Sequence, residues 1–179
     1  MISPLSNYQI TQHFGVSAQD YSKFGYPGHN GVDLVTFDSP PVVYAACEGR
    51  CLKVGWDEGG YGKYIVLQHP TLSTYYCHLD QVFIKPGDVV EAGEPIGILG
   101  STGNSTGPHL HFAFRQGTLG IYKGYYDAEP SLLDSDSPII RDITTLIYVP
   151  AVSKIPTTGK VKKPSTHGKR TLYPRMKYF

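Results

Sequence analysis

Cysteine and long apolar runs are both scarce in this chain. Only three cysteines, Cys47, Cys51 and Cys77, occur among 179 residues, and no CxxC pair is present. An odd number of cysteines without paired spacing argues against a disulfide framework, so we expect free thiols. No apolar run approaches the ~18 residues that a membrane-spanning helix needs. The first residues, MISPLSNYQITQHFG, have neither a basic nor an apolar region, so no secretory signal peptide is expected.

Charge is low overall and unevenly distributed. Charged residues make up 17% of the chain and hydrophobic residues 40%, a composition typical of a globular body with a core. Residues 1–140 contain 7 Lys and Arg against 14 Asp and Glu, a net charge of −7, whereas residues 141–179 contain 9 against 1, a net charge of +8. We therefore expect one domain over residues 1–137 and a basic C-terminal extension over 138–179, partly extended or disordered. Within the extension, SPIIRDITTLIYVPAV is expected to add one strand.

Short strands alternate with turns from about residue 30 to residue 115. EGG at 58–60 and KPGD at 85–88 have the composition of turns. No segment keeps a 3.6-residue apolar period over three turns, and short connections favour antiparallel pairing. The sequence therefore predicts an all-β fold made of antiparallel sheets of short strands. The runs rich in Val, Ile, Leu and Tyr that carry this prediction are VYAACEGRCLKVGW, YGKYIVLQH, STYYCHL and GEPIGILG.

Two histidines stand two residues apart in GPHLHF, at the start of an expected strand. Side chains alternate along a strand, so His109 and His111 point to the same face, roughly 6.5–7 Å apart at the backbone. That separation suits two groups converging on a metal ion and its bound water. The alternative is a pair of half-exposed strand histidines without a ligand.

Further candidate ligands lie upstream. GHNGVDL supplies His29 and Asp33, which can converge if the chain turns at Gly31. Catalytic zinc usually takes three protein ligands from His, Asp and Glu and leaves a fourth position to water. His29, Asp33 and one histidine of the HxH pair would make such a set. The other histidine of the pair would then remain beside the open position.

His78 in STYYCHL is a further candidate for a place beside that position. Strand alternation predicts Tyr76 and His78 on one face and Cys77 on the other. His69 in VLQHP is instead expected to be a satisfied, partly buried histidine. Cys47 and Cys51 are expected to be small core residues rather than soft zinc ligands.

The ordered series GHNGVDL, YYCHL and GSTGNSTGPHLHF resembles the lysostaphin-like (M23, LytM-type) zinc endopeptidases, which cut peptide cross-links of bacterial peptidoglycan. The resemblance covers about residues 10 to 118, and YYDAEPSLL continues it to about 133. It implies a lysostaphin-type, duplicated hybrid motif-like fold whose sheets form a substrate groove. It also implies one Zn²⁺ per chain and peptidoglycan as the partner.

By the same resemblance the zinc ligands fall on His29, Asp33 and His111, and the catalytic histidines on His78 and His109. A tyrosine upstream of the first ligand often stabilises the oxyanion in this family. Tyr26 is a candidate, but its spacing does not settle the alignment.

Zinc-assisted amide hydrolysis is the expected chemistry. Zinc lowers the pKa of its water to about 7 and polarises the scissile carbonyl. His78 and His109 would move the proton and hold the oxyanion. The Gly-, Ser- and Thr-rich loop 100–108 would form a wall of the groove. Because HExxH is absent, a helical glutamate of the thermolysin type is not the base.

Two other functions stay open. Relatives that have lost ligands act only as wall-binding or activator modules of the same fold. Alternatively, IKPGDVVEAGEPIGILG has the Gly-Asp-x-Val pattern of lipoyl or phosphocarrier hybrid motifs, although no lysine stands at a carrier hairpin tip. That second interpretation leaves His29, Asp33 and His111 unexplained.

The expected biological setting is a bacteriophage enzyme, either an endolysin or a virion-associated hydrolase. It would be made in the cytoplasm of the infected host, act at the cell wall, and could contact phage tail or virion proteins. A bacterial enzyme without its export signal is the alternative. The sequence does not distinguish a glycine bridge from a direct diaminopimelate link as the bond that is cut.

The end of the extension, IPTTGKVKKPSTHGKRTLYPRMKYF, is basic and interleaved with tyrosine and proline. It is either a solvated terminus or an electrostatic tether to an anionic cell wall. Nucleic acid could use the same charges but would leave the zinc ligands unexplained.

Truncation after Ala151 separates these two interpretations. The tether predicts that the shortened chain sediments less with purified walls at low salt, and that the difference from the full chain vanishes at high salt. The reason is that exposed charges are screened within about 8–10 Å at physiological ionic strength. Equal sedimentation of both chains at low and high salt would contradict the tether.

Overall fold

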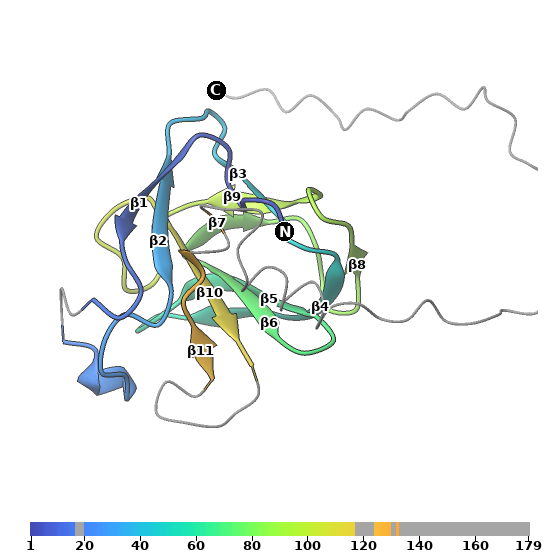
Figure 1. The fold of residues 1–179 in the computed structure, drawn as a ribbon. Coiled ribbons are helices and arrows are strands. Elements are labelled where there is room, and N and C mark those ends of the chain that lie inside the picture. The colour runs from blue at the N-terminus through green and yellow to red at the C-terminus, as the bar shows by residue number, and fades with distance from the viewer. Residues whose placement is uncertain (17–19, 117–123, 130–131, 133–179) are drawn as a thin grey trace, which may run out of the picture. The chain divides into compact units, whose positions relative to one another are not determined.

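The computed structural model describes residues 1–16, 20–116, 124–129 and 132, and these residues form two antiparallel β-sheets (Figure 1). The larger sheet has the strand order β1-β2-β10-β6-β5-β4-β8, with β11 beside β10, and the smaller sheet has the order β3-β9-β7. The strands of the larger sheet are β1 (Tyr8–Gln12), β2 (Val32–Thr36), β10 (Leu110–Arg115), β6 (Ser73–Cys77), β5 (Gly62–Gln68), β4 (Gly49–Asp57), β8 (Val89–Val90) and β11 (Tyr125–Tyr126). The smaller sheet contains β3 (Val42–Tyr44), β9 (Pro95–Leu99) and β7 (Leu79–Val82), and a 3-10 helix, η1, spans Ser22–Phe24.

The main hydrophobic core contains side chains from both sheets. Val43 and Ile96 of the smaller sheet belong to the same buried cluster as Ile65 and Phe112 of the larger one. The smaller sheet therefore covers one face of the larger sheet, and Figure 1 shows β3, β9 and β7 alongside β5 and β6. Burial of this shared apolar surface is what holds the sheets together.

β10 has a different kind of side chain on each of its two faces. Leu110, Phe112 and Phe114 are buried in the main core, as strand alternation requires. His111 lies between Leu110 and Phe112 in the chain and therefore points to the opposite face. The core side of β10 thus fixes the strand whose other side carries a candidate ligand.

The predicted all-β, antiparallel architecture is confirmed, since every strand pairing in the described residues is antiparallel. One predicted run, VYAACEGRCLKVGW, is not a single strand: it divides into β3 and β4, which belong to different sheets. The chain passes between the sheets through Ala45, Ala46 and Cys47, which are small enough to be buried at that crossing.

The expected behaviour of the cysteines and of His69 is confirmed. Cys47, Cys51 and Cys77 are buried free thiols. His69 is 5% exposed, and its two ring nitrogens lie 2.7 Å from the Glu48 carbonyl oxygen and 2.9 Å from Thr74 Oγ1. Burial lowers the pKa of His69, so this histidine is a neutral, satisfied member of the interior.

The boundary predicted after residue 137, the extra strand and the basic extension over 138–179 lie outside the described residues. Among the residues that the structure describes, no helix is both long and apolar enough to span a membrane.

Candidate metal centre

Asp33 and His111 face each other on neighbouring strands. In the pairing of β2 with β10, the Cα of His111 is the direct partner of the Cα of Asp33. Directly opposite side chains on one face of an antiparallel pair have Cβ atoms ≈ 4.5–5.5 Å apart, so the two functional groups can meet. His111 Nδ1 lies 3.0 Å from Asp33 Oδ1.

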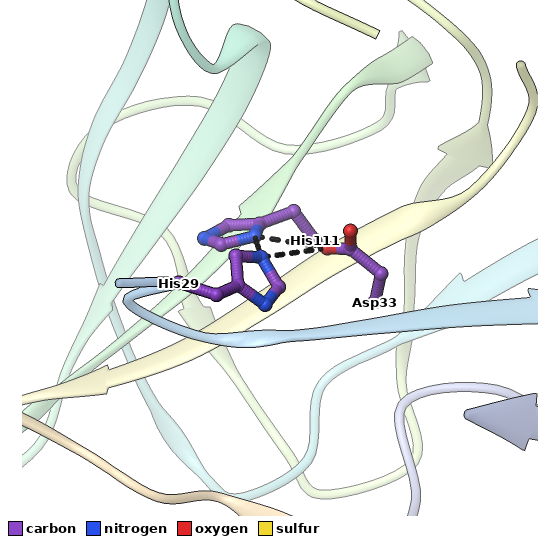
Figure 2. A group of neighbouring side chains, drawn as sticks. All are labelled: His29, Asp33 and His111. Carbon is purple, nitrogen blue, oxygen red and sulfur yellow. Dashed lines mark hydrogen bonds and ion pairs between the residues drawn. The ribbon is translucent and has the colours of Figure 1, made fainter. Parts of the chain in front are cut away.

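His29 completes a triangle with these two residues (Figure 2). Its Nε2 atom lies 2.9 Å from His111 Nδ1 and 3.1 Å from Asp33 Oδ1. His29 stands in the loop before β2, and Gly31 lies between it and Asp33. A Cβ atom on residue 31 would come within 2.6 Å of the Phe112 carbonyl oxygen, so only glycine lets this loop lie against β10.

The protonation of His29 follows from its other nitrogen. His29 Nδ1 lies 3.2 Å from the carbonyl oxygen of His13. A carbonyl can only accept a hydrogen bond, so Nδ1 carries the proton and Nε2 presents a lone pair to the triangle. In a neutral imidazole, His29 Nε2 can therefore only accept, and the one possible donor to it is His111 Nδ1, because the carboxylate of Asp33 has no proton to give.

The triangle fits a shared metal ion better than it fits hydrogen bonds. With Nε2 of His29 unprotonated, at most one proton, that on His111 Nδ1, is available for three contacts of about 3 Å. Ligands at 2.0–2.1 Å from a tetrahedral zinc would lie roughly 3.3 Å from one another. Among the described residues, His29, Asp33 and His111 form a group of side chains whose ligand atoms lie close enough together to hold one metal ion. Two nitrogens and one carboxylate oxygen are a donor set typical of catalytic zinc.

Two further histidines lie next to the triangle. His109 Nε2 is 3.7 Å from Asp33 Oδ2, and the rings of His78 and His109 have centroids 4.6 Å apart. Each ring donates Nδ1–H to a main-chain carbonyl: His78 to Thr102 at 2.7 Å and His109 to Gly107 at 2.8 Å. Both neutral rings therefore keep an unprotonated Nε2.

The surroundings of the site lower the pKa values of Asp33, His78 and His111. Burial acts to raise the pKa of Asp33, but the contacts with His111 and His29 outweigh it and hold that pKa below its usual range. Burial, with a contribution from nearby His111, lowers the pKa of His78 to about 4. Burial also lowers the pKa of His111. At neutral pH the site thus contains the carboxylate of Asp33 beside the neutral imidazoles of His78 and His111.

All five residues predicted from the sequence line one cleft, which has a volume of about 220 Å³. The expected wall from loop 100–108 is present, because Asn104 and Thr106 line the same cleft. Tyr26 lines it too, and so does Tyr21, whose ring centroid lies 5.6 Å from that of His29. No spacing rule in the sequence singled out Tyr21.

The predicted facing of Tyr76 and His78 is wrong. β6 ends at Cys77, and His78 has a φ of 63°, in the left-handed region. Strand alternation therefore stops one residue early: Tyr76 packs in the main core, whereas the ring of His78 lies near His109 and His111. Tyr61 also lies in the cleft beside His111, although no motif in the sequence singles it out.

A cleft on a β-sheet scaffold with two histidines and a carboxylate converging on one point defines a site of the metallopeptidase kind. A model of peptidase family M23 matches residues 27–123, more than half of the chain. The chain therefore belongs to peptidase family M23.

Several M23 proteins are similar to this chain. Lysostaphin of Staphylococcus simulans is 42% identical over 86 residues, 47% of this chain and 17% of lysostaphin. Peptidoglycan DD-endopeptidase ShyB of Vibrio cholerae is 40% identical over 85 residues, 47% of this chain and 20% of ShyB. The chain thus spans about a fifth of the length of these curated relatives.

The fold is likewise that of lysostaphin-type catalytic domains. The solved catalytic domain of lysostaphin from S. simulans matches with a TM-score of 0.63 and 31% identity, over 71% of this chain and 93% of that domain. A zinc-containing peptidase from V. cholerae matches with a TM-score of 0.56 and 32% identity, over 67% of this chain and 35% of that one.

Gly31 provides a test of how tightly the site is packed. We expect Gly31→Ala to lower the free energy of unfolding by about 1–3 kcal/mol, because the added methyl group would overlap Phe112 and His111. Urea denaturation measures the change.

Gly59→Ala is the matched control, since a Cβ atom at residue 59 meets no other atom within 4 Å. We expect it to change stability by no more than about 0.5 kcal/mol. Equal effects of the two substitutions would contradict the close approach of the His29–Asp33 loop to β10.

Proposed function

We propose that this chain is a zinc-dependent endopeptidase that hydrolyses peptide cross-links of bacterial peptidoglycan. The observation that carries the proposal is the convergence of His29, Asp33 and His111 within a cleft that also contains His78 and His109. The names of two relatives in the same family, lysostaphin and a peptidoglycan DD-endopeptidase, support the substrate class.

In this proposal His29, Asp33 and His111 hold one Zn²⁺ ion. The bound metal supplies a Lewis acid and a water of lowered pKa. The hydrogen bond from His29 Nδ1 to the His13 carbonyl keeps the ligating nitrogen unprotonated and aimed at the site. The ionised carboxylate of Asp33 offsets part of the metal's charge.

His78 and His109 act on the proton and on the substrate oxygen. Their Nδ1–H groups are committed to main-chain carbonyls, so each ring has a single free nitrogen, Nε2, for chemistry. One Nε2 takes up the proton released by the attacking water and delivers it to the leaving amine. The other, after it has taken a proton from bulk water, donates a hydrogen bond to the developing oxyanion. Positioned acid–base groups of this kind contribute about 10²–10⁴-fold to rate.

Ligand and proton-transfer roles predict different variants. His111→Ala and Asp33→Ala should lose both bound zinc and hydrolysis of purified cell walls, because two ligands do not retain the ion. His109→Ala and His78→Ala should keep about one zinc per chain but lose about 10²–10⁴-fold in rate. Zinc is measured by elemental analysis of the purified protein and hydrolysis by the release of soluble wall fragments.

Two results would contradict the proposal. Wild-type protein that binds zinc but leaves walls intact would favour the alternative, a catalytically silent wall-binding or activator module. Full hydrolysis by a zinc-free His111→Ala protein would remove the metal from the mechanism.

Which cross-link is cut is settled by digestion of purified muropeptides. Muropeptides from walls with glycine bridges and muropeptides from walls with direct diaminopimelate links are digested separately, and the new amino termini are identified by mass spectrometry. A terminal glycine identifies bridge cleavage, and a freed diaminopimelate amine identifies direct-link cleavage. No new terminus in either wall would contradict the endopeptidase assignment.

A phage origin, as an endolysin or virion-associated enzyme, is the finer part of the proposal. Its support is similarity to a prophage-encoded M23 protein, EnpA of Enterococcus faecalis. The solved catalytic domain of a mutant of EnpA matches with a TM-score of 0.56 and 26% identity, over 69% of this chain and 91% of that one. Flanking genes for tail or lysis proteins would agree with a phage origin, whereas a bacterial cell-wall locus would contradict it.

A further inference from the structure

His111 differs from the other three histidines of the cleft in how its ring is held. His29, His78 and His109 each donate one ring N–H to a main-chain carbonyl oxygen. The Nε2 atom of His111 is buried and has no hydrogen-bond partner among the described residues. A metal-ligating histidine almost always has such a partner, which fixes its ring plane.

The ring of Tyr61 lies against the face of His111. The two ring centroids are 5.5 Å apart, and their planes differ by 26°, a stacked arrangement. The other rings near His111 meet it edge-on: His29 at 60° and His78 at 72°. Among the described residues, Tyr61 is therefore the ring whose stacked contact blocks rotation of the His111 imidazole out of its plane.

Tyr61 is itself held by several hydrogen bonds. Its hydroxyl accepts a hydrogen bond from Asn30 Nδ2 at 2.6 Å and lies 2.9 Å from the hydroxyl of Tyr125. Its carbonyl oxygen accepts the main-chain N–H of His78 at 2.8 Å. Asn30 directly follows His29 in the chain. Tyr61 therefore contacts the loop that carries one candidate ligand, the ring of a second, His111, and the backbone of His78.

We infer that Tyr61 is a positioning residue, whose stacked ring takes the place of the missing hydrogen bond and fixes the His111 imidazole for metal binding. The inference rests on the proposed zinc site. In it, ring packing sets the ligand plane, and the hydroxyl contacts serve to hold the tyrosine ring in place.

Zinc affinity of Tyr61 variants, measured by competition with a chelator, tests the inference without reference to activity. Tyr61→Leu should bind zinc about 10–100-fold more weakly than wild type, the usual cost of losing an outer-shell partner. Tyr61→Phe keeps the stack and should stay within about threefold of wild type. Melting of the zinc-free proteins checks that each variant is folded.

Tyr64→Leu is the matched control. Tyr64 is buried in the same small cluster and contacts Tyr61, with ring centroids 5.8 Å apart. Lys53 Nζ lies 5.3 Å from the centroid of the Tyr64 ring, and none of the ring contacts of Tyr64 in the described residues is with a histidine. It loses the same aromatic ring without removing the stack on His111. We expect its zinc affinity to stay within about threefold of wild type.

Three results would overturn the inference while leaving the zinc site intact. They are wild-type affinity in folded Tyr61→Leu, an equal loss in Tyr64→Leu, or a loss in Tyr61→Phe as large as in Tyr61→Leu. The last result would assign the effect to the hydroxyl contacts instead of the ring. A wild-type protein that binds no zinc would overturn both the inference and the proposed function.

Discussion

The pairing of β2 with β10 brings Asp33 directly opposite His111, and the rest of the site depends on this register. Because side chains alternate along a strand, a slip of one residue would turn His111 toward the core and bring Leu110 or Phe112 to the cleft. The large apolar side chains of β10 on the core side make such a slip costly. Hydrophobic packing on one face of the sheet therefore fixes the position of a polar group on the other.

Main-chain carbonyls then decide which nitrogens remain available. Loops carry His29, His78 and His109 to the cleft, and each imidazole is oriented by a carbonyl oxygen of His13, Thr102 or Gly107. These contacts use backbone groups, so they are insensitive to the side chain at those three positions. In the neutral form of each ring they leave Nε2 available, which is the atom required by the proposed roles of His29 as a ligand and of His78 and His109 as proton carriers.

Much of this arrangement could be predicted from the sequence, because it depends on local patterns. Alternation in PHLHF places His109 and His111 on one face, and both do approach the carboxylate of Asp33. The reversal at His78 could not be predicted, because it depends on a left-handed backbone conformation that a non-glycine residue rarely adopts. Nor could Tyr61 be selected: its contact with His111 brings together residues 50 positions apart, on a turn and a strand that only the folded sheet makes neighbours. The division of VYAACEGRCLKVGW between two sheets could not be predicted either. The small buried residues at the crossing, Ala45, Ala46 and Cys47, are equally compatible with one continuous strand.

The claim that three side chains from β10, β2 and the loop before it share one metal ion is tested most directly by anomalous diffraction. Crystals of the purified protein would be measured on both sides of the zinc absorption edge. We expect one strong anomalous peak within bonding distance, about 2.0–2.2 Å, of His29 Nε2, Asp33 Oδ1 and His111 Nδ1. A zinc-saturated protein with no peak at this position, or with its peak at other side chains, would contradict it.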